Sequence, residues 1–139
     1  MKTFQKTKKF LFAVLLIGLS SCAGLHFSQS AYDADKRIQT NATQLLDSAS
    51  QSYKAHAAQV VALQTDMANV LQAEKARGKT NIATIQMWQQ VQTGSGNLGT
   101  LLTLWKTQDT LSKAMIPESK QQIQRLLNSI SDLENYKIK

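Results

Sequence analysis

The chain has 139 residues, 42% hydrophobic and 18% charged, which is the size and composition of one domain. Its net charge of +7 suggests a nucleic-acid binder, but four of the 16 basic residues lie within the first nine positions (Lys2, Lys6, Lys8 and Lys9). That leaves 12 basic against 9 acidic residues, a balance that argues against nucleic acid as a partner. A single cysteine excludes an intrachain disulfide and a cysteine-based zinc site.

The first residues have the organisation of a secretory signal peptide. A basic segment, 1–9, precedes an uninterrupted apolar run over residues 10–19. Ten helical residues span about 15 Å, whereas a transmembrane helix needs about 20 residues. The run is therefore too short for a permanent membrane span, and we expect residues 1–21 to be removed from the mature protein.

The end of the apolar run resembles the lipobox of bacterial lipoproteins. It reads Leu19-Ser20-Ser21-Cys22, a branched apolar residue and two small residues before a cysteine. The resemblance covers the first 22 residues alone. It implies a diacylglyceryl group on the Cys22 thiol, cleavage between Ser21 and Cys22, and acylation of the new amine. The alternative is an ordinary signal peptide that contains a cysteine at this position.

The same resemblance implies a location and an anchor. Two or three acyl chains hold a protein on a membrane far more firmly than one chain does. Position 23 is alanine, whereas aspartate there tends to retain such lipoproteins in the inner membrane, so we expect the periplasmic face of the outer membrane. Residues 22–32 lack a clear period and are interpreted as a lipid-anchored tether, and residues 33–139 as the folded domain.

A long segment free of helix breakers follows. Residues 25–77 contain no glycine or proline, and Gly24 and Gly78 flank this segment. Apolar residues recur at alternating steps of four and three, which is typical of a heptad seam. We therefore expect one helix over residues 33–76, about 66 Å long. The seam consists of Ala42, Leu46, Ala49, Tyr53, His56, Val60, Leu63, Met67 and Val70.

Shorter helical segments make up the rest of the chain. Apolar spacing predicts helices over 81–93 and 98–115, and Pro117 marks the start of a final helix over 117–137. Short connections place neighbouring helices antiparallel. The sequence thus predicts an all-α, elongated antiparallel bundle. An alternative makes residues 100–107 a strand, although nothing else in the chain is a strand partner.

The break between 81–93 and 98–115 contains Gly94, Gly96 and Gly99, and it is flanked by Trp88 and Trp105. Two interpretations remain open. The glycines could form a hinge beside a tryptophan-lined groove for a partner helix or peptide. Alternatively they form a loop between helices, with both tryptophans packed in the core.

No catalytic or metal site is expected. In the helical body His56 has no second histidine or cysteine with which to complete a metal site, and it is expected to pack beside Tyr53 and Val60. Several acidic residues of the body have the spacing of a solvated surface: Asp47, Asp66, Asp109, Asp132 and Glu134. No cofactor is expected beyond the covalent lipid on Cys22.

These features predict a non-enzymatic, membrane-anchored lipoprotein that acts as a protein-interaction or assembly factor of the cell envelope. Its partners would be the membrane and an envelope protein, and a homo-oligomer stays open because part of the long helix could pair with another subunit. Two groups of lipoproteins are analogous in architecture: those that pilot secretins and those that exclude a second phage or plasmid. This chain shares no sequence motif with either group, so the comparison is by analogy alone. The alternative is a periplasmic helical protein that binds a small ligand or metal, with His56 as its candidate residue.

Overall fold

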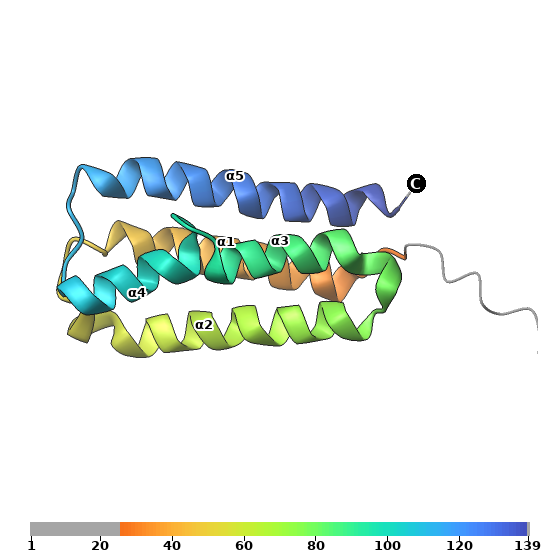
Figure 1. Cartoon of the computed structure of the whole chain (residues 1–139), viewed down its shortest axis with the longest axis horizontal. Coiled ribbons are helices and arrows are strands. Elements are labelled where there is room, and N and C mark those ends of the chain that lie inside the picture. Colours follow the sequence, from red (N-terminus) through yellow and green to blue (C-terminus); the bar gives the residue numbers. More distant parts are fainter. Residues whose placement is uncertain (1–25, 139) are drawn as a thin grey trace, which may run out of the picture.

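The computed structural model describes residues 26–138, which form an antiparallel all-α bundle (Figure 1). Consecutive arms run in opposite directions, with α3 and α4 together forming one arm. This is the up-down-up-down arrangement, and it confirms the predicted fold class. The elements are α1 (Gln29–Asp47), α2 (Tyr53–Ala76), the 3₁₀ turn η1 (Lys79–Asn81), α3 (Ile82–Thr93), α4 (Leu98–Gln108) and α5 (Met115–Tyr136).

The bundle has two distinct ends (Figure 1). The tether end, where residues 26–28 lead into α1, also holds the end of α2, η1, the start of α3 and the end of α5. The far end consists of the turn 48–52 and the loop 109–114. Between residues 26 and 138, no helix has both the length and the apolar character that crossing a membrane requires.

The prediction of one helix over 33–76 is wrong. The chain turns at residues 48–52, and α2 folds back against α1. Three of the five turn residues are serine, whose hydroxyl competes for backbone hydrogen bonds and weakens a helix. The predicted 66 Å rod is therefore a hairpin of two shorter helices.

Contacts from a distant loop stabilise this turn. The Leu111 N–H donates to the Ala49 carbonyl at 2.8 Å, and the Tyr53 N–H donates to the Asp109 carbonyl at 2.7 Å. The helix hydrogen bonds lost at the turn are thus replaced by tertiary ones. No local pattern in residues 48–52 reveals these partners.

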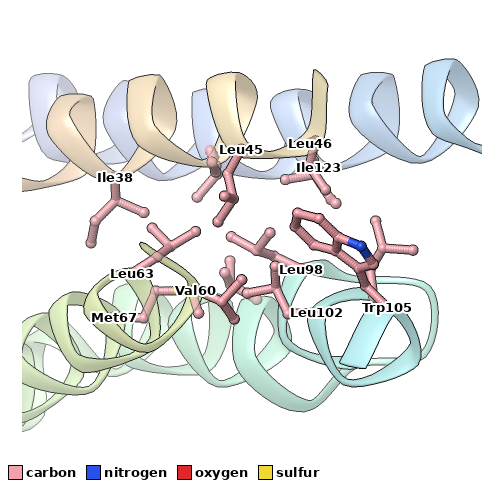
Figure 2. Close-up of a cluster of buried hydrophobic side chains, with 14 of the residues drawn as sticks. Ile38, Leu45, Leu46, Val60, Leu63, Met67, Leu98, Leu102, Trp105 and Ile123 are labelled. Atoms are coloured by element: carbon pink, nitrogen blue, oxygen red, sulfur yellow. The ribbon is translucent and has the colours of Figure 1, made fainter. Parts of the chain in front are cut away.

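The predicted seam nevertheless forms the core. Leu46 on α1 and Leu63 and Met67 on α2 are buried together with Leu98 and Trp105 of α4 (Figure 2). The part of the seam on α1 packs against the part on α2, and the other helices of the chain cover both. The part of the seam that could have paired with another subunit is therefore packed inside this chain.

The largest difference between the later elements and the expected ranges is at the end of α4. The helix predicted over 98–115 ends at Gln108, because Asp109 adopts a positive φ of 65° and turns the chain into the loop 109–114. Residues 100–107 lie in α4, so the strand alternative is wrong. α5 begins two residues before Pro117, whose missing N–H falls in the first turn, where backbone donors have no helical partner.

Candidate functional site

Five charged side chains gather at the tether end, and we call them the ionic cluster: Asp35, Glu74, Arg77, Glu134 and Lys137. They come from α1, from α2 and the residue after it, and from α5 and the residue after it. Asp35, Glu74 and Glu134 are each at most 2% exposed. Burying a charge is costly unless it is paired, so the pairing within the cluster decides whether this end is stable.

Glu134 is the centre of the cluster. Its Oε1 accepts hydrogen bonds from Arg77 Nη2 at 2.8 Å and from the Ser28 N–H at 2.7 Å. Its Oε2 accepts from Lys137 Nζ at 2.5 Å and from Arg77 Nη1 at 3.1 Å. Burial raises the pKa of Glu134, but the hydrogen bonds from Arg77, Lys137 and Ser28 outweigh it and bring the pKa below its ordinary value.

Glu74 shares the same arginine. Arg77 Nη1 lies 3.0 Å from each oxygen of the Glu74 carboxylate, and the Asn81 side-chain amide also donates to Glu74. The hydrogen bond from Arg77 to Glu134 is the main reason that the pKa of Arg77 is raised above its ordinary value. The two carboxylates and the guanidinium therefore form one charged, hydrogen-bonded unit across α2 and α5.

Asp35 differs from the other two acids. Burial, followed by repulsion from Glu74 and Glu134, raises the pKa of Asp35 to about 7, although Lys137 and Arg77 act in the opposite direction. Its Oδ1 accepts no hydrogen bond from any residue that the structure describes. Asp35 therefore changes its protonation near neutral pH.

The cluster also fastens the first described residues to the bundle. Arg77 Nη2 donates to the His26 carbonyl, and the Ser28 N–H donates to Glu134. Ser28 in turn caps α1, because its Oγ accepts from the Ala31 N–H at 3.2 Å. The segment entering α1 is thus tied to the ends of α2 and α5.

The prediction that Glu134 lies on a solvated surface is wrong, since the side chain is buried, and the cluster around it is not evident from the sequence alone. A signal was present, since each acid continues an apolar stripe at helical spacing. Asp35 precedes Ile38 and Ala42, and Glu74 follows Met67 and Val70. Glu134 likewise follows Leu127 and Ile130. An acid in register with a core stripe at the end of a helix indicates a buried charge.

The predicted lipidation and cleavage residues, Cys22 and Ser21, lie outside the described residues. The two tryptophans are fully buried, so they belong to the core and do not line an open groove. Trp105 Nε1 donates to the carbonyls of Gln51 and Asp109 at 3.0 and 3.1 Å, which holds the far end together.

The three glycines permit a tight corner between α3 and α4. A Cβ on Gly99 would lie 1.8 Å from the Gln92 carbonyl oxygen, so the first turn of α4 packs directly on the last turn of α3. Gly96 has a φ of 71°, which side-chain-bearing residues rarely adopt, and Gly94 ends α3. The backbone approach, rather than an exposed groove, accounts for these glycines.

His56 is half-buried near the far end and lies against Trp105, with ring centroids 5.5 Å apart. Its ring nitrogens are hydrogen-bonded to the side chains of Gln59 at 2.8 Å and Gln51 at 2.9 Å. It also lines a crevice of about 400 Å³ between α1 and α2, whose wall includes Asp66. Within residues 26–138, no three histidine, cysteine or acidic side chains are placed to hold a metal ion.

No family model, curated protein or solved structure matches this chain. These comparisons therefore supply no role for the bundle or its ionic cluster. Any function has to be argued from the residues described above.

Proposed function

We propose that this chain is a non-enzymatic lipoprotein of the bacterial cell envelope, anchored by lipid on Cys22 at the periplasmic face of the outer membrane. It acts there as a protein-interaction or assembly factor. The lipobox Leu19-Ser20-Ser21-Cys22 supports the anchor. The all-α bundle supports the second part, because the faces of amphipathic helices are a recurring element of protein recognition.

The observation that carries the proposal is the attachment of residues 26–28 to the ionic cluster. Residues 23–25 alone separate Cys22 from His26, so the chain can place at most about 14 Å between these two residues. Arg77 holds the His26 carbonyl, and Glu134 holds the Ser28 N–H. A lipid on Cys22 would therefore hold the bundle by its tether end, with a restricted orientation and the far end directed away from the bilayer.

The state of the polar side chains favours a binding role over catalysis. Glu134 already accepts four hydrogen bonds, Glu74 is paired with Arg77, and His56 is bonded on both ring nitrogens. A general base or nucleophile needs an oxygen or nitrogen free to reach a substrate. These groups are engaged in holding the fold, and Asp35, whose Oδ1 accepts no hydrogen bond from the described residues, is only 2% exposed and so is out of a substrate's reach.

The anchor and the partner can be tested together. Cys22→Ala, exported behind a signal peptide that is cleaved without lipidation in place of residues 1–21, should move from the membrane fraction to the released periplasmic fraction, while its helical content stays unchanged. Pull-down of the wild-type protein from detergent extracts should enrich one defined envelope protein. Membrane retention of Cys22→Ala would contradict the anchor, and absence of any enriched protein would contradict the interaction role.

A periplasmic small-ligand or metal-binding protein is a second candidate, favoured by the crevice between α1 and α2. Its wall carries polar side chains from both helices, among them Asn41, Gln44, His56 and Asp66. A thermal shift screen against metal ions and metabolites separates the candidates. A rise in melting temperature of several degrees that His56→Ala abolishes, without a protein partner, would favour ligand binding.

A further inference from the structure

We propose that the tether end of the bundle is itself a membrane-contacting surface, which rests against the bilayer that holds the lipid on Cys22. This inference rests on the anchor proposed above and extends it from a flexible tether to a docked body. The surface consists of Lys75, Lys79, Ile82, Tyr136 and Ile138, and we call it the docking surface.

Exposed apolar side chains concentrate at this end. Ile82, Tyr136 and Ile138 are 59%, 68% and 63% exposed, and they lie at the start of α3, at the last residue of α5 and two residues beyond it. Other exposed large apolar residues of the described chain, Val61 and Met115, lie along α2 and at the start of α5. Single exposed apolar residues are ordinary, but a group at one end of a bundle marks an interaction site.

Hydrogen bonds join the chain segments that carry these apolar residues. Lys137 Nζ donates to Asn81 Oδ1 at 2.6 Å and to Thr84 Oγ1 at 3.2 Å, which joins the end of α5 to the start of α3. Residue 82 lies between these two acceptors in sequence, and residues 136 and 138 flank the donor. The three apolar side chains therefore come from segments held together by a buried lysine.

Two exposed lysines border the apolar residues. Lys75 and Lys79 line a hollow of about 390 Å³ between α2 and α3, and its wall also includes Ile82 and Ile85. Ammonium groups beside isoleucine side chains match the chemistry of a phospholipid, with phosphate at the surface and hydrocarbon beneath. This combination commits the surface to a lipid bilayer carrying anionic headgroups.

The distance to the anchor supports the same partner. The His26 carbonyl is held by Arg77, which is two residues from Lys75 and two from Lys79. Because at most about 14 Å of chain separates Cys22 from His26, a lipid on Cys22 would bring the docking surface to headgroup level. Docking then needs no further ordering of the chain beyond the attachment already made by the ionic cluster.

The test compares the labelling of two exposed lysines by an amine-reactive reagent, read by mass spectrometry. Lys79 belongs to the docking surface, and Lys113 lies in the loop at the far end. The mature wild-type protein is reconstituted into vesicles containing phosphatidylglycerol, and the Cys22→Ala protein is measured free in the same buffer. We expect Lys79 to react about tenfold more slowly in vesicles, which corresponds to about 1.4 kcal/mol in favour of contact. Lys113 should react equally in both samples.

A variant ties the protection to the apolar residues. Replacing Ile82, Tyr136 and Ile138 together by serine should restore the labelling of Lys79 in vesicles, while the lipid keeps the protein bound. Val61→Ser, an equally exposed change on α2, is the matched control and should leave Lys79 protected. Circular dichroism of each variant checks that the bundle is intact.

The outcomes separate the two proposals. If mass spectrometry finds no lipid on the wild-type protein, the proposed anchor fails. If the protein is lipidated and vesicle-bound but Lys79 reacts as fast as in the free protein, the anchor stands and membrane docking is refuted. Protection of Lys79 in the free Cys22→Ala protein would assign the surface to a protein contact and also refute docking to the bilayer.

Discussion

Arg77 and Glu134 are 57 positions apart in the sequence, yet Arg77 Nη2 lies 2.8 Å from Glu134 Oε1 and Arg77 Nη1 lies 3.1 Å from Glu134 Oε2. This bidentate ion pair joins the ends of α2 and α5 at the tether end. Because the same arginine also holds the His26 carbonyl, the pair connects the bundle to the segment that leads toward Cys22. The same guanidinium therefore stabilises the packing of this end and attaches the tether to it.

Glu134→Gln should destabilise the protein by about 3 kcal/mol, because it leaves Arg77 and the buried Lys137 without their shared counter-charge. Denaturant unfolding followed by circular dichroism measures the change. Asp132→Asn is the control, an exposed acid on the same helix, whose replacement should change stability by less than about 0.5 kcal/mol. Equal stability of the two variants would show that the ionic cluster does not support the fold.

Asp35 makes the stability of the protein depend on pH. Since its folded-state pKa is about 7 and its ordinary value is 3.8, the folded state keeps a proton that the unfolded state has released between these values. The contribution of Asp35 is therefore fully present below pH 3.8 and is lost as the pH rises through 7. The lowered pKa of Glu134 acts in the opposite direction, and its contribution is lost as the pH falls.

Asp35→Asn isolates this effect, because Glu134 is present in both proteins. Relative to the wild type, the free energy of unfolding of Asp35→Asn should rise between about pH 4 and pH 7, by as much as about 4 kcal/mol. Urea unfolding at pH 5 and pH 8 measures the difference. Asp33→Asn, an exposed acid on the same helix, should show no such rise. A constant difference between Asp35→Asn and the wild type would contradict a raised pKa.

Gly99→Ala should cost at least about 1 to 3 kcal/mol, because the new methyl group would meet the backbone carbonyl of Gln92, which cannot rotate away as a side chain can. Lys106→Ala, an exposed change on α4, serves as the control and should be close to neutral. Thermal unfolding of the two variants measures the difference. An alanine tolerated at position 99 would show that α3 and α4 do not meet so closely.

The two buried tryptophans offer a matched pair. Trp105 Nε1 donates to two carbonyls, whereas Trp88 Nε1 donates to no residue between 26 and 138. Both substitutions by phenylalanine remove the same volume, but Trp105→Phe also leaves the Gln51 carbonyl without this donor, whereas the Asp109 carbonyl keeps the Tyr53 N–H. We therefore expect Trp105→Phe to cost about 1 to 3 kcal/mol more than Trp88→Phe. Equal costs in chemical denaturation would contradict this role of the indole N–H.

Periodicity was sufficient to predict the fold class and most of the core. The alternating four-three spacing identified Leu46, Leu63 and Met67, all of which are buried. It could not reveal the turn at 48–52, because the same spacing continues through that turn. The turn depends on Leu111 and Asp109, whose hydrogen bonds come from a loop about 60 residues later, and such tertiary partners leave no local trace.

The candidate site was less accessible from the sequence. Single acidic residues such as Asp35 and Glu134 are also typical of an exposed helical face. Their burial follows from the packing of three helix ends at the tether end, which the expected rod over 33–76 would have separated. Once the hairpin is known, Glu74 and Arg77 necessarily come close to the entry of α1.

The central claim is that Cys22 carries the lipid that anchors this bundle. Intact-mass spectrometry of the full-length protein expressed in a bacterium and extracted from membranes tests it most directly. We expect a mature chain that begins at Cys22, with added mass equal to a diacylglyceryl group and an N-linked acyl chain. A free Cys22 thiol, or a chain that still carries residues 1–21, would contradict the claim.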